Sequence, residues 1–80
     1  MDISRAFALV LRQHRERMTL SQEALAEKAG LHPTYIGMLE RSVRNPSLNV
    51  TQELARALGL PLAKLIAEAE TLQAKSKPKG

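Results

Sequence analysis

Cysteine and tryptophan are both absent from this chain of 80 residues. Without cysteine the chain can form no disulfide bridge and offers no thiolate ligand for a structural metal site. The longest unbroken apolar run, residues 6–11, is far shorter than the roughly 18 residues that a membrane-spanning helix needs. The first residues include an acid and lack a long apolar stretch, so we expect no signal peptide. These absences argue against a disulfide-stapled secreted protein, a membrane span and a zinc finger, and they predict a single cytoplasmic domain.

A strong charge of one sign is also missing from most of the chain. The formal net charge is +4, but residues 75–80 alone contain three lysines and no acid. Because these six residues also lack any apolar side chain, we expect them to form a disordered basic tail behind a folded domain at residues 1–74. The folded part is only mildly basic, so net charge by itself is weak evidence for a nucleic-acid partner.

Leucine and alanine dominate the composition. The chain has thirteen leucines and eleven alanines, which are strong helix formers, against one phenylalanine and one tyrosine. No stretch sustains the period-two alternation of a half-buried strand, and no internal repeat is visible. The composition therefore predicts an all-α fold.

Apolar spacing and capping residues predict five helices, at about residues 3–17, 21–29, 33–41, 49–58 and 61–74. Asp2 or Ser4 is placed to cap the first helix, and Ser21 is placed to cap the second. Pro33 and Pro61 suit the first positions of the third and fifth helices, because a proline lacks the N–H group that would have no acceptor there.

The second and third predicted helices are separated by only about three residues, Gly30-Leu31-His32. A connection this short forces a steep crossing angle and requires a small residue where the helices approach, and Ala26 supplies it one turn before Gly30. Leu25, Ile36 and Leu39 supply the shared apolar contact. This spacing predicts a helix-turn-helix.

At this point the sequence resembles a known family. The blocks that carry the resemblance are Leu20-Ser21-Gln22-Glu23-Ala24-Leu25-Ala26, Gly30-Leu31, Tyr35-Ile36, Leu39-Glu40-Arg41, Asn45-Pro46-Ser47-Leu48 and Leu54-Ala55-Arg56-Ala57-Leu58-Gly59. In this order and at these spacings they are similar to the XRE/Cro-type helix-turn-helix family, which includes phage repressors and restriction–modification controller proteins. The resemblance covers about residues 5–70. It implies a five-helix, lambda-repressor-like domain that binds operator DNA and dimerises.

The resemblance also implies how the domain would contact DNA. The helix at residues 33–41 would enter the major groove, and the helix at residues 21–29 would lie across the groove with its N-terminus at a phosphate. The predicted DNA contacts are Gln22, His32, Pro33, Thr34, Tyr35, Met38, Arg41 and Arg44.

These contacts are expected to have different roles. Base-reading positions are expected on the solvent-facing early turns of the third helix, at His32, Pro33, Thr34, Gly37 and Met38. Tyr35 is expected to reach a phosphate, and Arg41 and Arg44 suit phosphates or the minor groove. Proline and glycine form no bidentate contacts with bases, so we expect modest direct readout and a contribution from DNA shape.

Two further positions, Arg15 and Glu40, are predicted to be structural. The family pattern pairs Arg15 with Glu40, which would tie the first helix to the end of the third. His14 stands where relatives usually carry leucine, and the sequence leaves open whether it is buried. No cofactor or metal site is expected, because the chain has two histidines, no cysteine and no glycine-rich phosphate loop.

One small module reads only a few base pairs, so a symmetric dimer is expected. Its predicted surface lies on the fifth helix and the corner before it, at Leu60, Leu62, Leu65, Ile66 and Leu72. The sequence thus predicts a non-enzymatic transcriptional regulator that binds double-stranded DNA as a homodimer on a pseudo-palindromic operator. The alternative is an antitoxin-like or other protein-interaction subunit, with secondary DNA binding.

Overall fold

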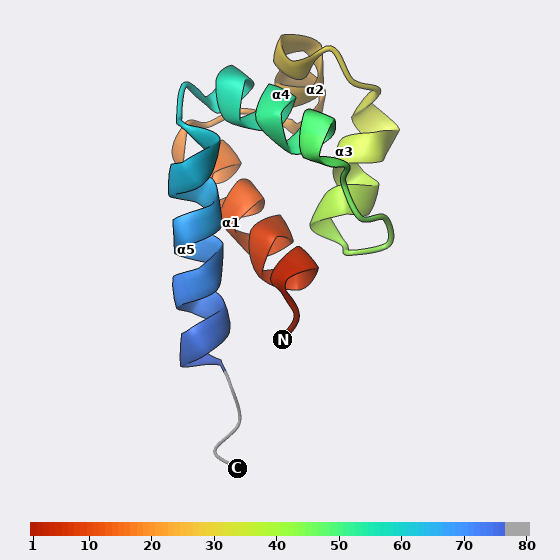
Figure 1. Ribbon diagram of the computed structural model, residues 1–80. Helices are drawn as coiled ribbons and strands as arrows, with labels where there is room; N and C mark the ends of the chain where they lie inside the picture. The colour runs from red at the N-terminus through yellow and green to blue at the C-terminus, as the bar shows by residue number, and fades with distance from the viewer. Residues whose placement is uncertain (77–80) are drawn as a thin grey trace.

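The computed structural model describes residues 1–76, and these residues form five helices and no strand (Figure 1). The helices are α1 (Ile3–Arg17), α2 (Gln22–Ala29), α3 (Pro33–Glu40), α4 (Leu48–Leu58) and α5 (Leu62–Lys75). The prediction of an all-α, five-helix domain is confirmed, and each predicted helix end lies within one residue of the observed end. Of the predicted basic tail, Lys75 closes α5 and residues 77–80 lie outside the described residues.

Side-chain caps begin most of the helices. Asp2 accepts a hydrogen bond of 2.9 Å from the amide of Arg5, and Ser21 accepts one of 2.9 Å from the amide of Ala24. Ser47 caps α4 in the same way. Such a cap satisfies an amide that has no acceptor inside the helix.

The prediction for Pro61 is wrong by one position. Pro33 is the first residue of α3, as expected, whereas Pro61 is the residue before α5 and keeps extended backbone angles. Its carbonyl oxygen accepts a hydrogen bond from the amide of Lys64, and this bond closes the first turn of the helix. Proline serves both positions, because its fixed φ angle is compatible with helical and extended backbone.

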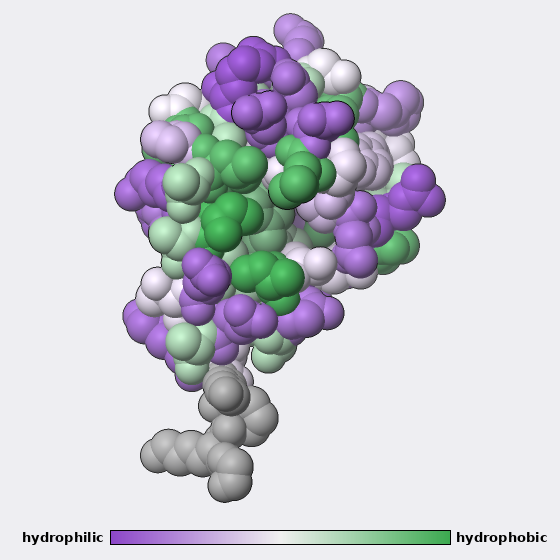
Figure 2. Space-filling view, in the orientation of Figure 1, coloured by the Kyte–Doolittle hydropathy of each residue, from purple (hydrophilic) through white to green (hydrophobic). Residues whose placement is uncertain are grey.

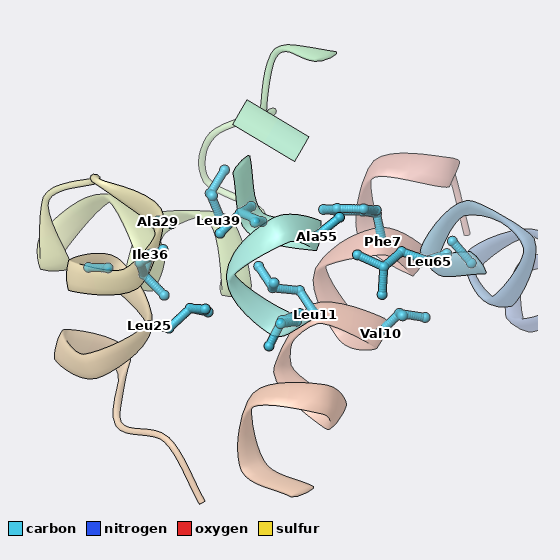
Figure 3. Packing of buried hydrophobic residues seen from close by; sticks show 14 residues of the cluster. Phe7, Val10, Leu11, Leu25, Ala29, Ile36, Leu39, Ala55 and Leu65 are labelled. Atoms are coloured by element: carbon cyan, nitrogen blue, oxygen red, sulfur yellow. The ribbon is translucent and has the colours of Figure 1, made fainter. Parts of the chain in front are cut away.

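One hydrophobic core joins all five helices. Each helix contributes a fully buried aliphatic side chain, and these are Leu11, Leu25, Ile36, Leu54 and Leu65. Figure 3 shows these side chains converging from α1, α2, α3 and α5 on the space beside α4. Complete burial of a leucine or isoleucine side chain stabilises a fold by about 1.5–3 kcal/mol, so this cluster fixes how α2 and α3 sit on the rest of the domain.

No helix among residues 1–76 has the length and apolar character that crossing a membrane requires.

Candidate nucleic-acid interface

A glycine in the left-handed backbone conformation makes the sharp turn between α2 and α3. Gly30 has a φ of 71° and ends α2, and the amide of Leu31 donates a hydrogen bond of 2.8 Å back to the carbonyl of Ala26. A positive φ is costly for residues with a Cβ atom, so glycine is favoured here. His32 then caps α3, because its Nδ1 atom accepts a hydrogen bond of 3.2 Å from the amide of Thr34.

The two faces of α3 differ in exposure. Ile36 and Leu39 are buried against the core, whereas Pro33 and Thr34 on the outer face are exposed. Ala26, which is fully buried, lets α2 lie close behind the helix. The short turn and the small residue therefore hold α3 with its outer face towards solvent.

The predicted DNA contacts fall into two groups. His32, Pro33, Thr34, Arg41 and Arg44 are exposed. Gln22, Tyr35 and Met38 are half-buried, with part of each residue accessible. The structure therefore leaves every residue of this set accessible along the start of α2, the outer side of α3 and the loop after it.

Gly37 does not lie open to solvent, which corrects its predicted role. The residue is buried, and a Cβ atom placed on it would lie 3.1 Å from Nη1 of Arg41 and 3.4 Å from Oε1 of Gln22. Two polar side chains, one from the end of α3 and one from the start of α2, therefore cover the glycine. The sequence prediction considered each position by its own side chain and missed this cover.

A buried ion pair holds α3 from behind. Nε and Nη2 of Arg15 donate hydrogen bonds of 2.6 and 3.0 Å to the two carboxylate oxygens of Glu40, whose side chain is 3% exposed. Arg15 also donates to the carbonyl oxygen of Leu20, and Gln22 donates through Nε2 to Oε1 of Glu40. The hydrogen bond with Glu40 raises the pKa of Arg15 above its ordinary value, against the opposing effect of burial. This cluster joins α1, the start of α2 and the end of α3.

His14 is buried, which settles the question that the sequence left open. Its Nε2 atom lies 2.7 Å from Oε1 of Glu68 on α5, and Lys64 approaches the other carboxylate oxygen at 3.3 Å. The hydrogen bond with His14 lowers the pKa of Glu68 below its ordinary value. A histidine on the apolar face of a helix requires a polar partner, but the sequence does not identify which residue of α5 supplies it.

The predicted dimer surface needs one correction. Leu65 is wholly buried in the core of the single chain, so it offers no surface to a second copy. Leu60, Leu62, Ile66 and Leu72 are half-buried and keep accessible apolar area. Figure 2 shows apolar side chains gathered where α5, α4 and the start of α1 meet.

The comparisons with known proteins agree with this geometry. The family model described as helix-turn-helix matches residues 11–65. The control protein C.SmaI of Serratia marcescens is 47% identical over 66 residues, which cover 82% of this chain and 79% of that protein. The chain belongs to the XRE-type helix-turn-helix family.

Solved structures of regulators share the fold. The restriction–modification controller protein C.AhdI of Aeromonas hydrophila is 41% identical, with a TM-score of 0.74 over 76% of this chain and 92% of that one. SinR, a master regulator for biofilm formation solved in complex with DNA, is 28% identical, with a TM-score of 0.70 over 75% and 97% of the two chains. The chain is thus a member of a family of transcriptional regulators that bind DNA, and its named relatives are not enzymes.

Proposed function

We propose that this protein is a sequence-specific regulator that binds double-stranded DNA as a homodimer at a pseudo-palindromic operator. The observation that carries the proposal is the outer face of α3, which is exposed along Pro33 and Thr34 while the opposite face is anchored in the core. A helix held in this way fits the major groove, and the capped start of α2 suits a phosphate. The similarity to control proteins and to SinR, solved with DNA, supports the same role.

The homodimer part of the proposal has two supports. An α3 of 8 residues is only about 12 Å long, so one copy reaches few base pairs. Accessible apolar side chains remain on the α4–α5 corner and on α5, at Leu60, Leu62, Ile66 and Leu72. To read two half-sites one turn of DNA apart, the two α3 helices of such a dimer must lie about 34–36 Å apart.

The cytoplasmic location stays a prediction.

Titration with duplex DNA tests the DNA-binding proposal. Affinity for a duplex selected from a random pool and for an unselected duplex is measured at two salt concentrations. We expect affinity to fall steeply with salt on both, and the selected duplex to bind at least about 10³-fold more tightly. Equal affinity for both duplexes would reject sequence-specific regulation.

Sedimentation of the free protein and of Ile66→Glu tests the dimer. The wild type should sediment as a dimer, and the glutamate should convert it to a monomer, because it introduces a charge into an apolar contact. Glu70→Gln, an exposed change on the same helix, is the matched control and should leave the dimer intact. A wild type that remains monomeric at high concentration would remove the symmetric operator.

A protein-interaction role is the second candidate. Val43 is 63% exposed and Leu48 is 80% exposed, and neither belongs to the predicted DNA contacts or dimer surface. A contiguous patch of exposed apolar side chains marks a contact with a partner protein, so the role requires that these two residues form part of one patch. The salt titration separates the two roles, because an interaction module without DNA binding would show no salt-dependent affinity for duplex DNA.

A further inference from the structure

One side of α3, next to Gln22 at the start of α2, contains little side chain of its own. Pro33, Gly37 and Arg41 follow one another at intervals of four residues, which places them on one side of the helix. Proline has no donor, and glycine has no side chain at all. A helix with such short residues can approach base edges closely, but it needs another group to read them.

Arg41 occupies the space that Gly37 leaves. The residue caps the C-terminus of α3, yet its guanidinium lies one turn back, over Gly37. A methyl group at position 37 would lie 3.1 Å from Nη1 and 3.9 Å from Cζ of Arg41. The guanidinium of this exposed residue therefore lies alongside the middle of α3, beside Gly37, rather than beyond the C-terminus of the helix.

The charge of Arg41 is available to a ligand. Its neighbour Glu40 already accepts hydrogen bonds from Arg15 and Gln22. Within the part of the chain that the structure describes, no carboxylate lies within ion-pair distance of Arg41. Because Gln22 donates to Glu40 through Nε2, its Oε1 atom faces the cover over Gly37, on the same side as the guanidinium.

We propose that Arg41 is the main base-reading residue of α3 and that it recognises guanine in the major groove. This inference rests on the proposed DNA-binding function and replaces the phosphate or minor-groove role that the sequence predicts for Arg41. The planar guanidinium donates two parallel hydrogen bonds, which match O6 and N7 of guanine. Gly37 is required because any larger residue would displace the guanidinium.

Selection of duplexes from a random pool tests the inference, with the wild type, Arg41→Ala and Arg44→Ala compared. The wild-type consensus should contain a guanine in each half-site for which Arg41→Ala shows no preference. That guanine should contribute about 5- to 150-fold to wild-type affinity. Arg44→Ala, an exposed arginine in the next loop, is the matched control and should weaken all duplexes alike.

Two substitutions separate bidentate reading from simple charge. Arg41→Lys keeps the charge but lacks the planar fork, so it should lose the guanine preference while retaining non-specific binding. Gly37→Ala should lose the same preference by moving the guanidinium, with a melting temperature equal to or above that of the wild type, because alanine favours a helix. Replacing the guanine by 7-deazaguanine, which lacks N7, should weaken binding by the wild type and not by Arg41→Ala.

The results can reject base reading by Arg41 without rejecting sequence-specific DNA binding by the protein. If Arg41→Ala melts like the wild type but weakens all duplexes equally, with a salt slope smaller by about one, Arg41 is a phosphate contact and the inference is overturned. If the wild type itself prefers no sequence, the proposed function fails, and the inference fails with it.

Discussion

Two buried polar clusters hold this small domain together, and they differ in what their charge depends on. The Arg15–Glu40 pair lies behind α3 with side chains 11% and 3% exposed, and arginine stays charged at every pH of interest. The His14–Glu68 pair lies between α1 and α5, with side chains 10% and 35% exposed, and the hydrogen bond with His14 lowers the pKa of Glu68. The domain therefore places its permanent charge pair behind the candidate DNA-reading helix and its proton-dependent pair at the helix proposed for dimerisation.

The difference also concerns the cost of losing a partner. Glu40 satisfies hydrogen bonds from two side chains, so its removal leaves a buried guanidinium without a counter-charge. Glu68 is partly solvated, so its loss removes the hydrogen-bond partner of His14 but no deeply buried counter-charge. We expect the first cluster to dominate stability and the second to give it a dependence on pH.

The largest expected effect comes from Glu40→Ala. We expect it to lower the free energy of unfolding by about 3–5 kcal/mol, because Arg15 would remain buried and unpaired. Chemical denaturation followed by circular dichroism measures the change. Glu53→Ala, which breaks an exposed pair with Arg56, is the control and should cost no more than about 0.5 kcal/mol. Melting of Glu40→Ala at the wild-type temperature would contradict the prediction.

Acid should weaken the second cluster selectively. The pKa of Glu68 is lower in the folded protein than in the unfolded chain, so its contribution is fully present above the ordinary glutamate pKa and is lost as pH falls through the folded value. Glu68→Gln should therefore lose stability at neutral pH, by about 1 kcal/mol or less for so exposed a group, and should lose less than the wild type on acidification. Thermal melting between about pH 7 and pH 3 measures both effects.

Glu70→Gln, an exposed change on the same helix, is the control for that experiment. It should keep the acid dependence of the wild type. An identical loss of stability on acidification in Glu68→Gln and the wild type would show that the His14–Glu68 pair carries no pH dependence.

The smallest effect is expected at Lys64, the outer member of the second cluster. Its ammonium lies 3.3 Å from Glu68 one turn along α5, and its side chain is 54% exposed. Lys64→Ala should cost about 0.3–0.5 kcal/mol, and that cost should vanish in high salt. Denaturation at two ionic strengths measures it. A loss as large as that of Glu40→Ala would break the distinction between the two clusters.

Much of the fold follows from local rules that the sequence displays. Asp2 and Ser21 begin their helices because a short oxygen side chain satisfies a free amide, and Gly30 ends α2 because the chain there needs a positive φ. These effects involve residues within one turn of each other, so their spacing is visible without coordinates. The failure at Pro61 is also local, since proline fits two adjacent positions equally well.

The candidate site was less accessible to sequence reasoning. The accessibility of His32, Thr34 and Arg44 follows from their place on the outer side of a helix-turn-helix. The cover over Gly37 does not, because it depends on where two long side chains from other turns come to rest. The prediction that Leu65 lies in the dimer surface failed for a related reason. The apolar stripe of an amphipathic helix does not show which of its residues are buried in the core of the single chain and which stay accessible.

By itself the sequence determined the number of helices, their ends to within one residue, the caps Asp2 and Ser21 and the helix-turn-helix spacing, because periodicity and capping act over four residues or fewer. Only the tertiary structure decided that His14 pairs with Glu68 and that Arg41 covers Gly37. His14 and Glu68 are 54 residues apart in the chain, and the position of Arg41 over Gly37 depends on the rotamer of a long side chain. The packing of the whole domain settles both.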